Sequence, residues 1–147
     1  MTQDQASQPQ ALTSPAQILK FWFEDTEPKQ HFVKDPAFDQ RVTDLLLPLH
    51  EQAVAGELED WRNQADSCLA LLILLDQAPR NMFRDTPRAF ATDAQAVVVA
   101  TKAIETGIDM QAAAERRLFF YLPFEHAEDL VLQNQAVALT AKLKEAR

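Results

Sequence analysis

Glycine is nearly absent from this sequence, since only Gly56 and Gly107 occur in 147 residues. An average globular chain contains about 7% glycine. Tight hairpin turns depend on glycine or asparagine at positive φ, so a sheet of short hairpins is disfavoured. The G-x-G-x-x-G fingerprint and the phosphate-binding P-loop each need closely spaced glycines, and this widely separated pair supplies neither. The scarcity of glycine therefore favours helices and excludes nucleotide binding through either loop.

The length and charge of the chain limit its organisation and its partners. A chain of 147 residues is the usual size of one domain. Residues 1–13 are polar, rich in glutamine and without hydrophobic periodicity, so we expect a disordered tail at 1–13 and a single all-helical domain at 14–147. The net charge of −8 gives no attraction to a nucleic-acid backbone or an anionic lipid surface. We therefore expect neither nucleic acid nor membrane as a partner.

The single cysteine and the N-terminal sequence indicate the compartment. Cys68 cannot form an intrachain disulfide and lies in an apolar run, which predicts a buried and inert thiol. The N-terminus has no basic start followed by an apolar stretch, so it does not resemble a secretory signal. The longest apolar run covers residues 68–75 and is far shorter than the roughly 18 residues of a membrane helix. These features predict a cytoplasmic protein.

Start and stop signals place two helices in the first half of the chain. Ser14 followed by Pro15, with Gln17 three positions after Ser14, predicts a capping box and a helix to about residue 24. Asp35 before a proline repeats the start signal, and Gly56 is placed as the C-terminal cap of the second helix. Pro48 lies inside this helix and removes one backbone donor, so we expect a kink or a break near residue 47.

The second half of the sequence predicts further helices. The apolar run at 68–75 is rich in leucine and indicates a central helix, which Pro79 is expected to end. Thr92 to Gln95 reads as a second capping box, opening a helix that Gly107 follows. A helix over about 112–122 should stop at Pro123, and a last helix should carry apolar residues from 130 to 141. Short connections predict that consecutive helices pack as antiparallel hairpins.

Two stretches are unusually polar for their positions, "LLDQAPRNMFRD" at 74–85 and "YLPFEHAEDL" at 121–130. In the second, Glu125, Glu128 and Asp129 fall within one predicted helical turn, where like charges repel and favour a neighbouring cation. The guanidinium groups of Arg80, Arg84 and Arg88 are suited to pairing with carboxylates. The candidate ligand-binding residues are therefore Asp76, Gln77, Arg80, Asn81, Arg84, Glu125, His126 and Asp129.

This polar cluster has two interpretations. It is either a structural ion-pair network that joins the end of the central helix to the start of the last one, or a pocket for a small anionic ligand. In the second case an arginine holds the anion and His126 is the candidate catalytic residue, because histidine transfers protons near neutral pH. No nucleophile and base are recognisable from their spacing, and we predict no cofactor.

A metal site is not predicted. His31, His50 and His126 are scattered, and no pair of histidines has the spacing of a metal-binding helix motif. We expect His31 and His50 to be surface residues. The aromatic residues Trp22 and Trp61 are expected in the core, because aromatic side chains bury large areas.

The chain from about residue 18 to 139 resembles the bacterial family called domain of unknown function 924. Six short motifs carry the resemblance, in chain order: "FWF" at 21–23, "KDPAFD" at 34–39, "AGELEDW" at 55–61, "LLDQAPRNMFR" at 74–84, "RAFATD" at 88–93 and "FYLPFEHAEDL" at 120–130. The resemblance implies an all-α fold of antiparallel helical hairpins in a right-handed superhelix, similar to tetratricopeptide-repeat (TPR) domains. It implies a bacterial, mostly cytosolic protein and no established activity.

The sequence departs from the family pattern in two places. Ala78 stands where the family usually has an aromatic residue, which predicts looser packing there. The family pattern also continues after residue 139 with a further helical segment that this sequence does not show, so an apolar face is left for association with a second copy.

Three functions stay open at this point. The first is a binding or interaction module that takes a protein, a peptide or a small anionic ligand through the polar cluster. The second is an enzyme acting on a small anionic metabolite with His126 in proton transfer. The third is a fragment that depends on assembly, for example as a homo-oligomer.

Overall fold

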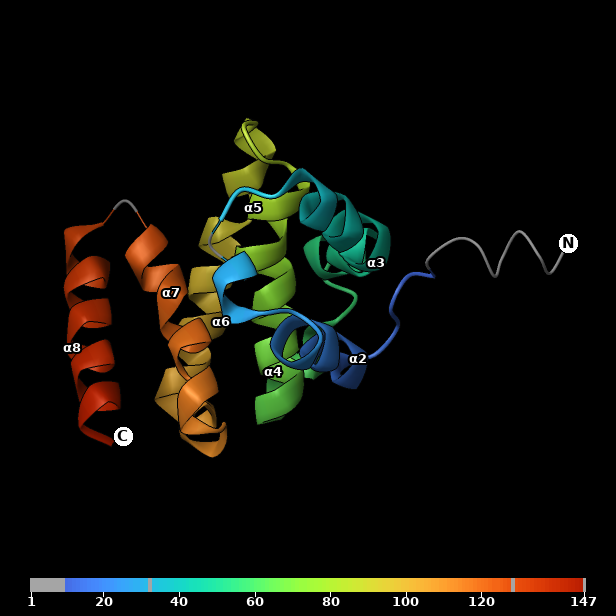
Figure 1. Ribbon diagram of the computed structural model, residues 1–147. Helices are drawn as coiled ribbons and strands as arrows, with labels where there is room; N and C mark the ends of the chain where they lie inside the picture. Colours follow the sequence, from blue (N-terminus) through green and yellow to red (C-terminus); the bar gives the residue numbers. More distant parts are fainter. Residues whose placement is uncertain (1–9, 32, 128, 147) are drawn as a thin grey trace, which may run out of the picture.

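The computed structural model of the chain describes residues 10–31, 33–127 and 129–146. All regular structure in these ranges is helical (Figure 1). The α-helices are α2 (Pro15–Leu19), α3 (Pro36–Val54), α4 (Ala65–Leu72), α5 (Ala78–Met82), α6 (Asp93–Thr106), α7 (Leu118–His126) and α8 (Leu130–Ala146). The all-helical class predicted from the sequence is confirmed.

The remaining elements are short helical turns, labelled η. Two are π-helical, η1 (Lys20–Glu24) and η4 (Ile73–Gln77). The 3₁₀ turns are η2 (Pro28–His31), η3 (Glu59–Asn63), η5 (Pro87–Phe90), η6 (Ile108–Gln111) and η7 (Ala114–Arg116). No helix in the described ranges is both long enough and apolar enough to cross a membrane.

The first two helices begin where the sequence predicts. The Ser14 side chain accepts a hydrogen bond from the backbone N–H of Gln17, and Asp35 caps α3 in the same way. The Gln17 side chain does not complete a capping box, because its oxygen accepts from the N–H and hydroxyl of Thr13 instead. Of the predicted tail, residues 1–9 lie outside the described residues, while the N–H of Leu12 donates to the carbonyl of Leu45.

Both glycines end helices in the left-handed conformation that favours glycine. Gly56 has φ of 80° after α3, and Gly107 has φ of 79° after α6. A kink or a break was predicted near residue 47, and no break occurs there, because α3 runs without interruption from Pro36 to Val54. Leu46 and Leu49 on either side of this proline are buried, so packing holds the helix together where one backbone hydrogen bond is missing.

Two predicted helix ends are wrong, because prolines lie inside helical segments. Pro79 occupies the first turn of α5, which follows α4 and η4 directly. Pro123 lies within α7, whose residues 119–124 are all buried. Pro79 leaves the carbonyl of Leu75 without a backbone N–H, and the Thr92 hydroxyl donates to this carbonyl instead. In α7, burial of six consecutive residues outweighs the loss of one backbone donor.

The second predicted capping box, at Thr92, is also wrong. Thr92 precedes α6 but makes no side-chain cap. Its hydroxyl donates to the carbonyl of Leu75, and the Gln95 amide donates to the carbonyl of Ala53. These two side chains therefore tie the start of α6 to neighbouring helices rather than to its own backbone.

The central segment of α4 and η4 is buried on all sides. Every residue from Cys68 to Pro79 is buried, and this segment contacts α2, α3, α6 and α7. Cys68 lies in this core as predicted, and burial raises the pKa of its thiol to about 11. A protonated, buried thiol is inert. Trp22 is also fully buried, and Trp61 packs against the core from its edge.

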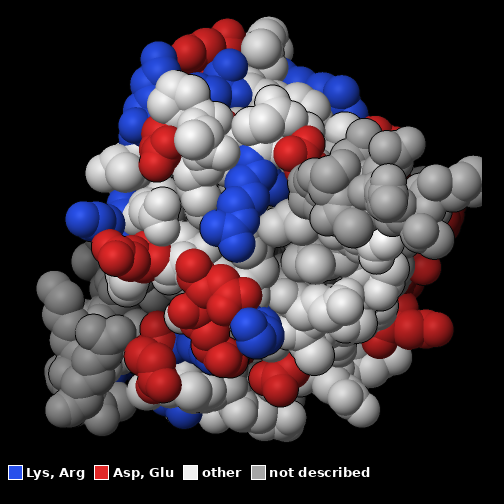
Figure 2. Space-filling model, turned by 45° about the vertical axis from the view of Figure 1, so that its right-hand side comes forward, with Lys and Arg blue, Asp and Glu red and all other residues white. Residues whose placement is uncertain are grey.

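Helices α6, α7 and α8 lie side by side, and α7 and α8 run antiparallel (Figure 1). Helix α8 packs through Ala136 and Leu143, which are buried. The residues whose spacing suggested a single face, including Leu130, Val131 and Val137, are exposed. On one face of the molecule acidic side chains gather in the lower half, with basic side chains among them (Figure 2).

Candidate functional site

The site begins with the irregular turn η4, where the buried central helix changes its hydrogen bonding. The N–H of Ala78 donates to the carbonyl of Ile73, five residues back. A regular α-helix would use the carbonyl of Leu74, which here accepts from Nδ1 of His50 at 2.8 Å. The next carbonyl, of Leu75, receives no N–H from Pro79 and accepts the Thr92 hydroxyl at 2.6 Å. Side chains from α3 and the start of α6 therefore satisfy the carbonyls that the π turn and the proline release.

The carboxylate of Asp76 is the centre of the site, with only 1% of its side chain exposed. Its Oδ1 lies 2.8 Å from Nδ1 of His126, and its Oδ2 accepts from the Gln77 amide at 3.0 Å. Nη1 of Arg80 is 3.4 Å from Oδ1. A buried carboxylate needs such partners, because an unpaired charge in the interior costs several kcal/mol. Asp76 thus fixes three side chains from η4, α5 and α7.

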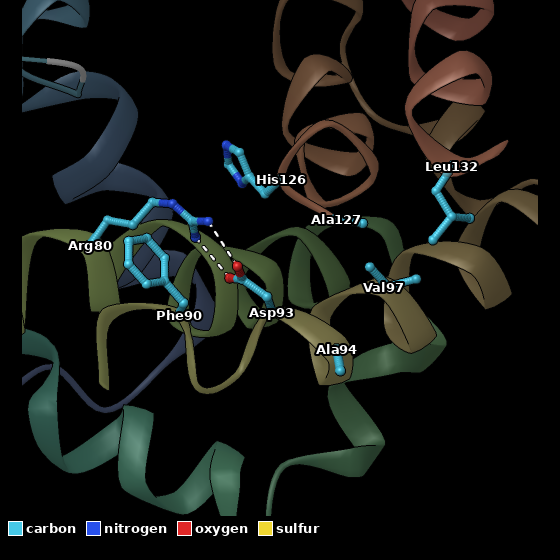
Figure 3. Close-up of a pocket in the computed structure, with 8 residues that line it drawn as sticks. All are labelled: Arg80, Phe90, Asp93, Ala94, Val97, His126, Ala127 and Leu132. Carbon is cyan, nitrogen blue, oxygen red and sulfur yellow. Dashed lines mark hydrogen bonds and ion pairs between the residues drawn. The ribbon is translucent and has the colours of Figure 1, made fainter. Parts of the chain in front are cut away.

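Arg80 joins α5 to α6 through a two-point ion pair. Its Nη1 and Nη2 atoms each lie 2.9 Å from one carboxylate oxygen of Asp93, the first residue of α6 (Figure 3). Nη1 also donates to the backbone carbonyl of Asp76 at 2.6 Å. The guanidinium carbon lies 5.3 Å from the ring centre of Phe90, within the range of a cation–π contact.

A second ion pair joins α5 to the first turn of α3. Nε and Nη2 of Arg84 lie 2.7 and 3.0 Å from the two carboxylate oxygens of Asp39, and the Asn81 amide donates to the same group at 2.9 Å. Burial alone would raise the pKa of Asp39. The hydrogen bonds and the positive charge of Arg84 outweigh it, so the pKa is lowered.

A pocket with a volume of about 780 Å³ opens beside this cluster (Figure 3). Arg80, Asp93 and His126 provide its polar lining, and Phe90, Ala94, Val97, Ala127 and Leu132 provide its apolar lining. A smaller hollow of about 210 Å³ is lined by His31, Gln77, Arg80, Asn81, Arg84 and His126. Arg80 and His126 line both, so the two spaces adjoin at these residues.

The structure brings six of the predicted site residues together and separates two from them. Asp76, Gln77, Arg80, Asn81, Arg84 and His126 form the cluster. Asp129 is not on the helix that carries Glu125, because α7 ends at His126 and Asp129 caps α8 by accepting from the N–H of Val131 and Leu132. Glu125 is exposed, and Glu128 lies outside the described residues.

The predicted pairing of arginines with these carboxylates is therefore wrong. Arg80 and Arg84 pair with Asp93 and Asp39, and Arg88 lies over the ring of Phe83 at 3.9 Å. Sequence reasoning missed both aspartates as partners. Asp39 ends the motif "KDPAFD" and Asp93 ends the motif "RAFATD", and both motifs carry the family resemblance. Their place in these motifs is the sequence feature that could have identified them as site residues.

His31 and His50 are not surface residues, contrary to the prediction. The His50 side chain is 2% exposed, and the His31 ring is half-buried and stacks on Trp22 with 4.4 Å between ring centres. Burial lowers the pKa of both histidines, and the carbonyls they contact offset this only in part. In the part of the chain that the structure describes, no group of three or more His, Cys, Asp or Glu side chains is placed to hold a metal ion.

The fold and the site define an all-helical protein with a buried network of aspartate, arginine and histidine beside an open pocket. A family model matches residues 18–147, and the chain belongs to this family, described as bacterial protein of unknown function, DUF924. A solved structure of a protein of unknown function from Agrobacterium tumefaciens is 43% identical, with a TM-score of 0.84 over 88% of this chain and 73% of that chain. No match was found among curated proteins. The family resemblance predicted from the motifs is confirmed.

Proposed function

We propose that this protein is a binding module, and that the pocket lined by Arg80, Asp93 and His126 holds its ligand. The observation that carries the proposal is the composition of the pocket walls. Fixed polar groups stand on one side, and Val97 and Leu132 supply apolar surface opposite them (Figure 3). Ligand sites combine apolar walls with a few precisely held polar groups in this way. The network behind the pocket holds Arg80 and His126 in one orientation before a ligand binds.

A fragment screen followed by protein NMR tests this function. Fragments that bind should shift the backbone signals of Ala94, Val97 and Ala127 together. Ala94→Trp should abolish these shifts, because the indole fills the pocket, whereas Val137→Trp on the exposed surface of α8 should leave them unchanged. Binding that shifts other regions, or that survives Ala94→Trp, would overturn the proposal.

A second candidate function is catalysis, with His126 as a proton acceptor. It is favoured by the contact between His126 Nδ1 and the buried Asp76 carboxylate, which directs Nε2 of the neutral ring away from the carboxylate. A carboxylate in this position fixes the tautomer of a general base. Any ligand found in the screen can be incubated with the parent protein and with His126→Gln and then analysed by mass spectrometry. Turnover by the parent alone would support catalysis, and an unchanged ligand in both samples would oppose it.

We also propose that the helical hairpins stack in a right-handed superhelix of the TPR type. The packing of α6, α7 and α8 in chain order supports this arrangement. A crystal structure tests it through the rotation that relates one hairpin to the next, which must be right-handed and repeated along the chain.

A further inference from the structure

The smaller hollow beside the pocket has an unusual distribution of hydrogen-bonding groups. Gln77 and Asn81 line it, and these two residues are 5% and 4% exposed. The Gln77 amide nitrogen donates to Oδ2 of Asp76 at 3.0 Å, and the Asn81 amide nitrogen donates to Oδ1 of Asp39 at 2.9 Å. A carboxylate can only accept, so each amide must turn its nitrogen to the carboxylate. Each amide oxygen is thereby left as the free acceptor.

These two oxygens have no hydrogen-bond partner within the described ranges, yet they are not sealed in the interior. In those ranges, the fully buried side-chain nitrogen and oxygen atoms without a hydrogen-bond partner are Trp22 Nε1 and Arg62 Nε. The oxygens of Gln77 and Asn81 are therefore reached by solvent, and both residues line the hollow. Water or a ligand in the hollow can supply the donor that each of these acceptors needs.

His126 adds a third acceptor. Its Nδ1 faces the carboxylate of Asp76 and must donate to it, so Nε2 of the neutral ring carries a lone pair. The charges of the two arginines that line the hollow are compensated, because Arg80 is paired with Asp93 and Arg84 with Asp39. The remaining lining residue, His31, has its Nε2 2.7 Å from the carbonyl of Trp22.

The charges of the cluster favour a cation over an anion. Three carboxylates, of Asp39, Asp76 and Asp93, stand against the two guanidinium groups of Arg80 and Arg84. With neutral His126 the cluster therefore carries one excess negative charge. A carboxylate or phosphate entering here would compete with Asp39 and Asp93 for the same two guanidinium groups.

We propose that the hollow binds the primary ammonium group of a small amine, whose apolar body lies in the adjoining pocket. The three N–H donors of the ammonium match the acceptors of Gln77, Asn81 and His126, and its charge balances the excess carboxylate. Phe90, Val97 and Leu132 supply apolar surface for the body of the ligand. This inference rests on the proposed function, since it names the ligand class of the same site.

Three probes of similar shape test the ammonium preference on the full chain at neutral pH. They are 2-phenylethylammonium, the neutral 2-phenylethanol and the anionic 3-phenylpropionate. Titrations followed by NMR should show the ammonium binding at least about tenfold more tightly than the other two, with shifts in the side-chain amide signals of Gln77 and Asn81. Equal binding of all three, or tighter binding of 3-phenylpropionate, would overturn the ammonium inference while the pocket function stands.

A substitution at Asn81 distinguishes binding in the hollow from binding in the pocket. Asn81→Leu should weaken binding of the ammonium probe about tenfold and leave 2-phenylethanol unaffected, and Asn134→Leu on the exposed surface of α8 is the matched control. If Asn81→Leu does not fold, the comparison of the three probes on the parent chain still tests the ammonium preference. If no probe binds while the fragment screen fills the pocket, the ammonium inference alone fails. An empty screen would overturn the proposed function as well.

Discussion

Nδ1 of His126 lies 2.8 Å from Oδ1 of Asp76, and this contact joins the end of α7 to the buried turn η4 across fifty positions of sequence. Asp76 is the deepest charge in the cluster, and it orients side chains that line the pocket. Stability and the orientation of the polar side chains in the pocket therefore depend on the same carboxylate.

Asp76→Asn should destabilise the protein by about 1–3 kcal/mol, because the buried amide cannot replace a carboxylate that serves His126, Gln77 and Arg80. Urea unfolding measures the change. Asp85→Asn is the matched control, since Asp85 is exposed and has a positive φ of 67°, which asparagine tolerates. Equal unfolding midpoints for the two variants would contradict the central role of Asp76.

Arg80→Lys should also destabilise the protein, by about 1–3 kcal/mol. A lysine ammonium cannot hold both oxygens of Asp93 with the geometry of the guanidinium and reach the Asp76 carbonyl as well. The same replacement at the exposed Arg41, whose guanidinium carbon also lies 5.3 Å from an aromatic ring centre, that of Phe21, should change the unfolding free energy by less than about 0.5 kcal/mol. A lysine at position 80 that is tolerated equally well would show that the two-point pair contributes little.

The free energy of unfolding should fall in acid because of Asp39. Its pKa in the folded protein is below the unfolded value of 3.8, so the unfolded state binds the proton first. The contribution of Asp39 is therefore complete above pH 3.8 and decreases as the pH falls through the folded pKa. Urea midpoints measured between neutral pH and pH 3 should fall less steeply in Asp39→Asn than in the parent. Identical acid slopes would contradict the ion pair with Arg84.

Thr92→Val should cost about 1 kcal/mol, because it leaves the buried carbonyl of Leu75 without its hydroxyl donor. Thr43→Val is the comparison, since the Thr43 hydroxyl donates to the backbone carbonyl of Asp39, four residues back in the same helix. That carbonyl keeps its helical backbone partner when the hydroxyl is removed. Thermal unfolding of both variants measures the difference. A larger loss for Thr43→Val would contradict the account of η4.

The sequence predicted the helix starts at Ser14 and Asp35 and the glycine caps, because these signals act within a few residues. It failed at Pro79 and Thr92 for one shared physical reason. The π turn and the proline release carbonyls that distant side chains satisfy, so a local stop signal and a local cap were replaced by tertiary hydrogen bonds. These tertiary hydrogen bonds depend on how the helices pack, and the sequence pattern around each residue gives no information on helix packing.

The sequence predicted most residues of the candidate site, but it did not predict which carboxylates pair with the arginines. Six of the eight residues proposed from the sequence meet in the cluster, but the carboxylates that hold the arginines are Asp39 and Asp93 rather than Glu125 and Asp129. Asp39 lies 45 positions from Arg84, and Asp93 lies 13 positions from Arg80. Nothing in local spacing favours these partners over the acidic residues at 125–129.

The central claim is that His126, Gln77 and Asn81 donate to the carboxylates of Asp76 and Asp39 and so keep acceptor atoms for a ligand. The tautomer of His126 tests this claim most directly. Long-range ¹H–¹⁵N correlation spectra of the imidazole, recorded over a series of pH values, distinguish the two neutral tautomers. We predict a proton on Nδ1 and a lone pair on Nε2 in the parent, with loss of this preference in Asp76→Leu, which has no acceptor for Nδ1. A neutral ring protonated on Nε2 in the parent protein would contradict the account.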